Sequence, residues 1–446
     1  MNAANLLFNE KIYYLLLDRE GQSLEEGETQ IGLEGENLTL LHASGDGFHV
    51  ELRDIADISA DDHKISVLLH SGQEMILSRL GYRYKDAHRE LILARNEVIL
   101  KDLLMGETLQ AGGIKAQADF PDKEKRVQIQ SPCEIRLYET ALVFLPQNAE
   151  VTRIPYSFIQ SVEEANYTLM LVLVSGEQVT FSKAGPHFDH LKASLSAAMN
   201  KMLLSAQETL RELMPFLPSM EIRDASRLLK EGRAVEKKEL VNVSPGLWEE
   251  LEKNIAVFGM EEYYAYLKGL SSDPDYVYAG LKKGLMGGQA GLYLWFMLPI
   301  YHNDPRKPGN AVVLEASGSD GSGRATYFFR IFPRGEYRSG LKPETLKKSS
   351  ANCSEFINRA MLTINFRREP VYISQEQLKE PRFKQYQFSI KRLPELRELR
   401  SRFIGRVMHH SLAQWQQDTL SLLTFNVDCT DDCLRWEKGF EVEESE

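Results

Sequence analysis

The chain has 446 residues, of which 43% are hydrophobic and 26% charged, a composition typical of a globular protein with several domains. Its formal net charge of −11 disfavours an overall attraction to membranes or nucleic acids. Only four cysteines occur, the N-terminal segment lacks the features of a signal peptide, and no apolar run is long enough to span a bilayer, so we expect a cytoplasmic protein.

One short segment of the sequence occurs twice. The stretch SGQEMILSRLG (Ser71 to Gly81) returns 104 residues later as SGEQVTFSKAG (Ser175 to Gly185). Apolar positions match at the same offset, without a gap, from the pair Leu38 and Leu142 to the pair Leu100 and Leu204. Chance matches do not preserve both the apolar phase and the turn residues over such a length. We therefore interpret the first half of the chain as a duplicated domain.

Each copy begins with β-rich segments and ends with a helix. The segments NLTLLHA and ALVFLPQ are typical of strands. KISVLLHSGQEMILS and TLMLVLVSGEQVTFS are typical of hairpins whose turn centres on Ser-Gly, where glycine adopts a positive φ at little cost. In the helices that follow, apolar residues recur at roughly helical spacing. They are Ala87, Leu91, Ala94, Val98 and Leu103 in the first copy and Leu191, Leu195, Ala198, Met202 and Leu210 in the second.

This order of elements resembles the pleckstrin-homology-like (PH-like) superfold, in which a bent antiparallel sheet is capped by one C-terminal amphipathic helix. The resemblance covers about residues 25–215, and the tandem copies look like those of bacterial PH-like proteins and some eukaryotic histone chaperones. It implies recognition of peptides, proteins or lipid headgroups, without catalysis. Phosphoinositide-binding members place several Lys and Arg around the first hairpin. Here that region is acidic in the first copy and offers only Arg153 in the second, which favours a protein partner over a membrane.

The second half begins with helices and continues with strands. SPGLWEELEKNIAVFG predicts a helix with Ser244 as N-cap and Pro245 at its first position, and DPDYVYAGLKKGLMGG predicts a second helix. GLYLWFMLPIYH, NAVVLEAS and RATYFFRIFPR predict three strands, antiparallel because their connections are short.

Helices return towards the C-terminus. ANCSEFINRAMLTINF predicts one helix, and Ser374 with Gln377 predicts a capping box before a short one. LPELRELRSRFIGRVMHHSLAQWQQDTLSLL predicts a long helix with Leu396, Leu399, Phe403, Val407 and Trp415 on one face.

Charge is segregated within the second half. The segment from Arg324 to Arg406 carries 19 Lys/Arg and 8 Asp/Glu, whereas the tail from Asp428 to Glu446 carries eight acids and two bases. The basic segment either binds an anionic partner such as nucleic acid or docks against acidic parts of the same chain. Its charges are interleaved with apolar residues at helical spacing, which favours docking. The residues that would bind an anion or nucleic acid are Arg330, Arg334, Arg338, Lys347, Lys348, Arg367 and Arg368.

Three motifs could carry chemistry, and each has a simpler interpretation. The glycines of GLMGGQAG lie between a predicted helix and a predicted strand, the reverse of a phosphate-binding loop. Cys429 and Cys433 could bind a metal with His409 or His410, but adjacent helical residues point about 100° apart. Either histidine could act as a base, but no nucleophile lies at a motif spacing. We therefore assign no metal ligand and no catalytic residue, and we expect no cofactor.

The sequence thus predicts the α+β class with three domains. These are a PH-like module over residues 1–110, a second PH-like module over residues 111–216, and an α+β domain with a small antiparallel sheet over residues 217–446. The expected function is that of a non-catalytic adaptor or assembly subunit that binds protein partners through the tandem modules. The alternatives are a nucleic-acid-associated accessory factor that uses the basic segment, and an enzyme with an unfamiliar site in residues 222–446. No motif indicates the partner's identity or the oligomeric state.

Overall fold

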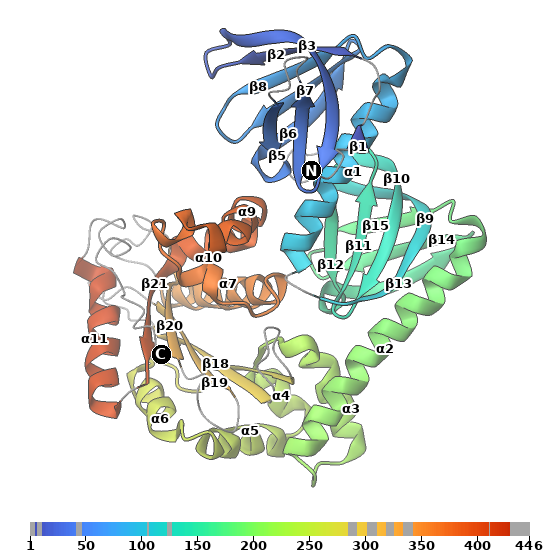
Figure 1. Cartoon of the computed structure of the whole chain (residues 1–446). Coiled ribbons are helices and arrows are strands. Elements are labelled where there is room, and N and C mark those ends of the chain that lie inside the picture. Colours follow the sequence, from blue (N-terminus) through green and yellow to red (C-terminus); the bar gives the residue numbers. More distant parts are fainter. Residues whose placement is uncertain are drawn as a thin grey trace. The chain divides into compact units, whose positions relative to one another are not determined.

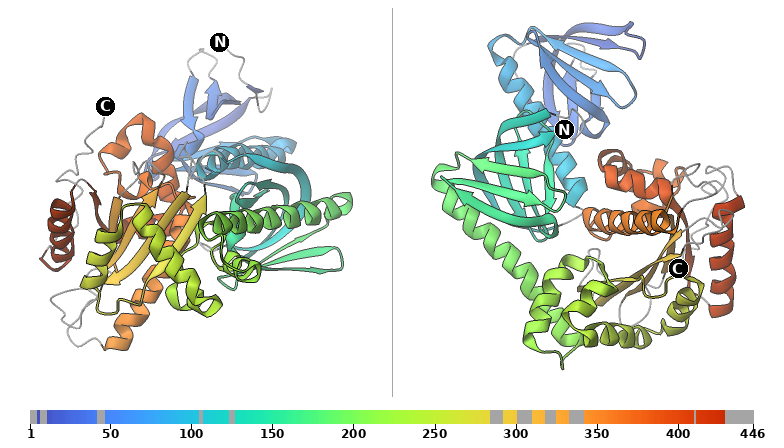
Figure 2. Two further views of the ribbon diagram at one scale, coloured as in Figure 1. Left: turned by 90° about the horizontal axis from the view of Figure 1, so that it is seen from below. Right: turned by 180° about the vertical axis from the view of Figure 1, so that it is seen from behind.

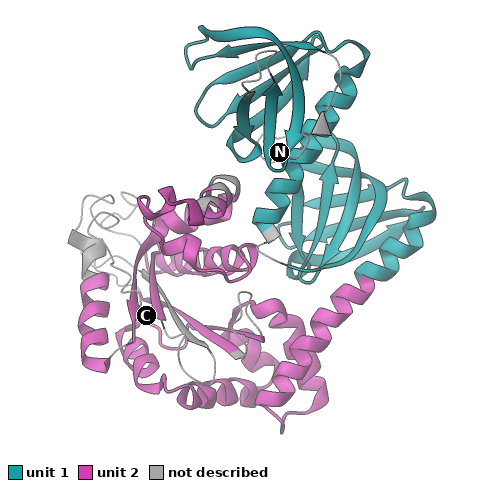
Figure 3. Cartoon of the chain, viewed as in Figure 1, with its two compact units in different colours: residues 1–195 teal, residues 196–446 magenta. Residues whose placement is uncertain are grey.

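The computed structural model describes the chain except residues 1–4, 7–10, 42–46, 105–106, 123–126, 284–291, 301–309, 318–324, 333–341, 410 and 429–446. The chain divides into two compact units, residues 1–195 and 196–446 (Figures 1 and 3). The boundary between them falls inside helix α2 (Phe188–Leu213). The domain boundaries after residues 110 and 216 stay predictions.

The first module of unit 1 is an antiparallel sheet followed by a helix. Its strands lie in the order β5-β4-β3-β2-β8-β7-β6, and β1 also pairs with β3. The elements are β1 (Asn5–Leu6), β2 (Ile12–Leu17), β3 (Ser23–Glu34), β4 (Asn37–Leu41), β5 (Gly47–Glu51), η1 (Leu52–Asp54), β6 (Ile55–Asp61), β7 (Lys64–Leu69), β8 (Glu74–Ser78), η2 (Gly81–Arg83) and α1 (Tyr84–Leu104).

The second module repeats this plan. Its sheet has the order β12-β11-β10-β9-β15-β14-β13, and helix α2 follows it. The elements are β9 (Leu109–Asp122), β10 (Val127–Tyr138), β11 (Ala141–Pro146), β12 (Thr152–Pro155), η3 (Tyr156–Phe158), β13 (Ile159–Ala165), β14 (Thr168–Leu173), β15 (Gln178–Ser182) and η4 (Gly185–His187).

The duplication inferred from the sequence is confirmed element by element. Strands β3, β6, β7 and β8 coincide at both ends with β10, β13, β14 and β15 when 104 is added to each residue number. Gly72 and Gly176 adopt φ of +88° and +84° in the two Ser-Gly turns, a conformation that glycine reaches without steric cost. The two sheet-plus-helix units and the α+β class are therefore confirmed.

Unit 2 contains a six-stranded antiparallel sheet in the order β16-β17-β18-β19-β20-β21. The strands are β16 (Val235–Glu236), β17 (Tyr278–Lys283), β18 (Leu292–Ile300), β19 (Asn310–Ser317), β20 (Ala325–Arg330) and β21 (Phe403–Met408). The helices are α3 (Ser219–Leu228), η5 (Lys230–Gly232), α4 (Lys237–Val243), α5 (Pro245–Val257), α6 (Glu261–Leu270), α7 (Pro343–Thr363), α8 (Glu369–Tyr372), η6 (Gln377–Lys379), η7 (Pro381–Phe383), α9 (Lys384–Arg392), α10 (Pro394–Arg402) and α11 (Leu412–Asp428).

Helices cover both faces of this sheet (Figures 1 and 2). Leu294, Phe296 and Leu298 belong to a core that also includes Trp248 of α5 and Trp415 of α11. The intervening residues of β18, which alternation turns to the other face, are buried as well. Burial on both faces explains why the strand is continuously apolar and lacks the alternation of a half-exposed strand.

Two predicted helices are wrong. Residues 278–283 form strand β17, in which Ala279 and Leu281 are buried, and Gly280 leaves room for the indole of Trp295. The predicted long helix is interrupted at residues 403–408 by strand β21, which pairs with β20. In both places the hydrogen bonds of the sheet override the local helical pattern.

Two predicted helix starts agree with the structure. Gln377 donates its backbone N–H to Ser374 Oγ at 3.1 Å, and Ser374 donates its own to Gln377 Oε1 at 3.0 Å, which confirms the capping box. Helix α5 begins at Pro245 as predicted, although the Ser244 hydroxyl makes no capping bond. Within the described residues, no helix is long and apolar enough to cross a membrane.

Candidate interaction surface

The outer face of the first sheet carries an apolar patch on strand β2. Ile12, Tyr14 and Leu16 are buried in the module's core, so alternation turns the residues between them to the opposite face. These residues are Tyr13, Leu15 and Leu17, and each is partly exposed. A strand with one face towards solvent normally carries polar residues on that face.

The register of the sheet extends this patch across two neighbouring strands. Leu15 lies opposite Ile76 of β8, which is partly exposed. Leu68 of β7 lies opposite Glu74, two residues from Ile76 on the same face, and is 40% exposed. We call these five residues, Tyr13, Leu15, Leu17, Leu68 and Ile76, the module 1 strip.

Carboxylates flank the module 1 strip on β3, β6 and β8, whereas Lys64 of β7 lies on the same face at the Tyr13 end. Glu26 lies opposite Leu15, Glu28 opposite Tyr13, Glu74 opposite both Leu17 and Leu68, and Asp57 opposite Leu68. We call Glu26, Glu28, Glu74 and Asp57 the carboxylate frame. It gives the margin of the strip a negative potential.

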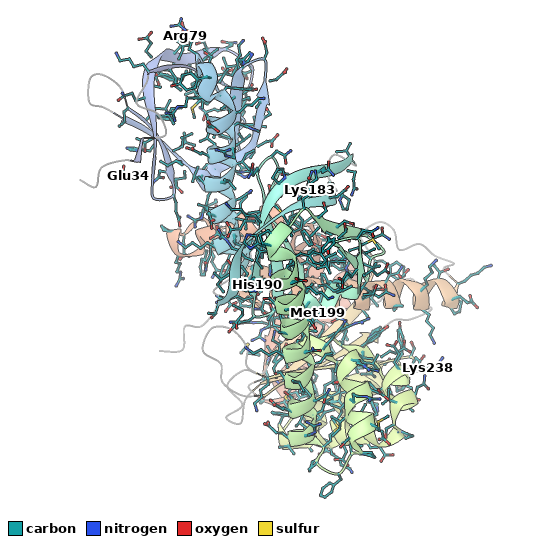
Figure 4. All side chains as sticks on the ribbon, turned by 90° about the vertical axis from the view of Figure 1, so that its right-hand side faces the viewer. Glu34, Arg79, Lys183, His190, Met199 and Lys238 are labelled. Carbon is teal, nitrogen blue, oxygen red and sulfur yellow. The ribbon has the colours of Figure 1, made fainter. Side chains whose placement is uncertain are left out.

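Three contacts connect the carboxylate frame to neighbouring side chains, and one of them is a hydrogen bond from the Ser66 hydroxyl to Glu74. The hydrogen bond from Tyr13 to Glu26 raises the pKa of the phenol, because the carboxylate is best satisfied by the protonated hydroxyl. The Arg79 guanidinium lies 4.8 Å from the centre of the Tyr13 ring and 3.3 Å from Glu28 Oε1, so it offsets one charge of the frame. Figure 4 labels Arg79 on this module.

The equivalent face of the second module is more polar. The residues that match the strip, 104 positions later, are Gln117, Asp119, Pro121, Val172 and Thr180. The residues that match the frame are Gln130, Pro132, Gln178 and Ser161. The second sheet therefore has polar residues at three of the five strip positions and no carboxylate at the four frame positions, so the fold requires neither the full strip nor the frame.

Helix α1 is shared by both modules of unit 1. Its residues Ala87 and Leu91 are buried in the core of the first module. The Asn96 amide donates to the carbonyls of Pro146 (3.3 Å) and Ala149 (2.9 Å), and its oxygen accepts the N–H of Val151 at 3.0 Å. Three hydrogen bonds from one buried side chain thus fix the β11–β12 connection of the second module to the helix of the first.

A buried ion pair joins Glu107 to Arg153 of the second module. The Glu107 side chain is fully buried and accepts hydrogen bonds from the Arg153 guanidinium (2.6 Å), the Thr140 hydroxyl (2.7 Å) and the Thr140 N–H (3.0 Å). On the other side, Arg53 of the first module donates to Asp102 near the end of α1 at 2.8 Å. Asp102 and Glu107 are therefore each paired with an arginine, Asp102 with one from the first module and Glu107 with one from the second.

The basic residues predicted for anion binding that the structure describes lie at three separate places. Lys347 and Lys348 are exposed near the start of α7, whereas Arg367 and Arg368 follow its end, about 20 Å further along at 1.5 Å per residue. Arg330 is only 6% exposed at the end of β20. Arg334 and Arg338 lie outside the described residues.

Two of these basic side chains already have partners within unit 2. Lys347 Nζ lies 3.7 Å from an Asp273 carboxylate oxygen and 5.4 Å from the centre of the Tyr276 ring. The Arg368 guanidinium lies 5.2 Å from the ring centre of Tyr293. These contacts favour a structural role for both residues.

The other motifs considered for chemistry are only partly described. The glycine-rich stretch 284–291, His410, Cys429 and Cys433 lie outside the described residues. His409 stacks on Tyr263 with ring centres 4.4 Å apart, and its Nε2 lies 2.7 Å from the Thr326 hydroxyl. Among the described residues, no three His, Cys, Asp or Glu side chains are grouped so as to hold a metal ion.

Sequence reasoning missed the module 1 strip, although a signal for it is present. Residues 12–17 read IYYLLL, which is apolar in both phases of a strand, whereas the matching residues 116–121 read AQADFP. A comparison with known proteins finds no family model and no curated protein that matches this sequence.

Proposed function

We propose that this protein is a non-catalytic adaptor or assembly subunit that binds a protein partner through its tandem modules. Two sheets of matching strand order, each followed by a helix, support the resemblance to tandem PH-like modules. That resemblance implies recognition without chemistry. Helix α1 joins the two modules, so a partner would meet surfaces at a fixed spacing.

The observation that carries the proposal is the difference between the two outer sheet faces. Leu15 and Ile76 leave apolar surface exposed in module 1, where Asp119 and Thr180 are polar in module 2. Contiguous exposed apolar surface costs solubility and commonly marks an interaction site. Because the second copy shows that the fold does not need this surface, we attribute it to binding.

Nucleic acid is the alternative partner, and the described basic residues give it less support. They lie at both ends of α7 and at the end of β20, and Arg330 is buried. A nucleic-acid interface needs a continuous basic stripe that follows the phosphate backbone.

Site-specific photo-crosslinking in the native host tests the proposal. A benzophenone amino acid replaces Leu68 in one variant and the matching Val172 in another. We expect a covalent protein partner from position 68 and little or none from position 172. Crosslinks to nucleic acid, equal yields of protein from both positions, or no adduct from either would contradict the proposal.

A further inference from the structure

We infer that the module 1 strip binds a cationic amphipathic helix of a protein partner. The inference rests on the proposed adaptor function and specifies the chemistry of the segment that is bound. It follows from three properties of the strip, namely its position within the sheet, its length and its charge.

The position of the strip excludes binding by strand addition. Strands β2 and β8 pair with each other, and each has a second neighbour, β3 for β2 and β7 for β8. Their backbone N–H and C=O groups are therefore already used in the sheet, and a ligand meets side chains only. A helix satisfies its own backbone hydrogen bonds, whereas an extended peptide lying on this face would leave its backbone unpaired in an apolar contact.

The length of the strip fits two turns of a helix. Tyr13 and Leu17 are four residues apart on β2, a distance of about 13 Å along an extended strand. Apolar residues at positions i and i+7 of a helix are about 10.5 Å apart and lie on the same side. Three or four such residues would cover the β2 residues, while Ile76 and Leu68 widen the contact to one side.

The charge of the strip's margin selects a basic ligand. The carboxylate frame places Glu26 on one side of the apolar residues and Asp57 on the other, with Glu74 between Leu17 and Leu68. Lysine or arginine residues that flank the apolar side of a helix would meet these carboxylates. Anionic phospholipid headgroups and nucleic-acid phosphates would be repelled, and so would the chain's own acidic residues 428–446.

The test uses the full-length chain and a fluorescent model helix of leucine and lysine, about 18 residues or about 27 Å long, with leucines at helical spacing. Two peptides serve as controls. One has the same composition in an order that forms no apolar face, and the other has glutamate in place of lysine. Fluorescence anisotropy measures binding at low and at high salt.

Two double variants copy the second module into the first. Leu15→Asp with Ile76→Thr introduces the residues found at positions 119 and 180, and Glu26→Gln with Glu74→Gln introduces those at 130 and 178. The same fold already accommodates these residues, and circular dichroism with hydrogen exchange of β2 and β8 checks that it is kept. Gln130→Ala with Thr180→Ala is the matched control in module 2.

We expect the lysine peptide to bind wild type and the module 2 control alike. The apolar variant should lose about tenfold in affinity or more, and the carboxylate variant should lose most of its salt dependence. Binding of the glutamate or scrambled peptide with equal affinity, or an unchanged affinity in both variants, would overturn the inference. The inference would also be overturned if the chain bound phosphatidylglycerol vesicles, a DNA oligonucleotide or a second copy of itself in place of the peptide, and if Leu15→Asp with Ile76→Thr abolished that binding. If the partner crosslinked at position 68 has no basic amphipathic helix, the adaptor proposal is still supported and only this inference is contradicted.

Discussion

Helices α1 and α2 begin at matching positions of the repeat, yet their surroundings differ. Asn96 of α1 is 1% exposed, whereas the matching Asn200 of α2 is exposed. Arg95 is 5% exposed, and its counterpart Met199, labelled in Figure 4, is partly buried. The helix of the first copy packs on its own sheet and also on the next module. The comparison shows how a duplicated module can acquire a second interface by changing one helix.

Removal of the buried acid in the connection after α1 should have the largest effect. Glu107→Ala leaves the Arg153 guanidinium, itself 5% exposed, without its carboxylate in the interior. Breaking a buried pair in this way costs about 3–5 kcal/mol. Hydrogen exchange followed by mass spectrometry should show reduced protection of β11 and β12, and Glu139→Ala at an exposed neighbouring position should leave it unchanged.

If hydrogen-exchange protection of β11 and β12 stays high in Glu107→Ala, other contacts within the second module stabilise these strands. Hydrogen exchange is the appropriate readout for unit 1 because all four tryptophans lie in unit 2, so their fluorescence reports on the other part of the chain.

The second prediction compares the two asparagines directly. Asn96→Ala removes three hydrogen bonds and leaves two carbonyls and one N–H of residues 146–151 unpaired, which costs about 2–4 kcal/mol. Asn200→Ala should change stability by less than about 0.5 kcal/mol, since the side chain is exposed. Exchange of the amides of residues 146–151 measures the difference. Equal effects of the two substitutions would show that α1 is not a shared element.

A smaller effect is expected from the surface pair that joins α1 to β10. Arg136 donates two parallel hydrogen bonds to Glu97, at 2.6 and 2.8 Å, but Glu97 is half exposed. Glu97→Gln should therefore cost about 1 kcal/mol or less, and less still at high salt. Lys201→Gln, at the matching position of α2, is the control, and urea unfolding of both variants at two salt concentrations measures the difference. A loss that does not depend on salt would indicate a packing role for Glu97.

The smallest effect concerns pH. Hydrogen bonds from Arg53 and Lys101 lower the pKa of Glu36 below its ordinary value of 4.5. The stabilisation is therefore complete above pH 4.5 and is lost as the pH falls through the lowered pKa. The side chain is about one-third exposed, so we expect less than about 1 kcal/mol. Wild type should lose more protection of β3 and β4 between pH 5 and pH 3 than Glu36→Gln, and equal losses would contradict this assignment.

The repeat and its strands and helices could be predicted because their sequence patterns are local. Leu169 and Leu171 alternate along a strand, and Gly176 marks its turn. Strand β21 could not be predicted, since the segment FIGRVM becomes a strand only by pairing with β20, far away in sequence. The apolar run IYYLLL indicates only the β2 part of the strip, because the register alone places Leu15, Ile76 and Leu68 side by side.

A count of charges does not show which of the charged side chains are buried. The basic segment includes Arg400, which is 6% exposed and donates its guanidinium protons to the backbone carbonyls of Pro370, Val371 and Ile373. Desolvation lowers the pKa of Arg400 to about 10, which is still well above neutrality. A formal charge counted from the sequence does not distinguish a buried arginine that binds backbone carbonyls from a cation on the surface.

Because corresponding elements of the two copies are 104 residues apart, a segment of one copy has the same length as its counterpart in the other. The hairpins β6–β7–β8 and β13–β14–β15 have the same strand lengths and the same loop lengths, and each is followed by the same three-residue turn into a helix. A chimaera could therefore receive residues 159–187 in place of 55–83 in a single transplant, with no loop to redesign. Such grafts would show which of the repeat's faces natural selection has put to use.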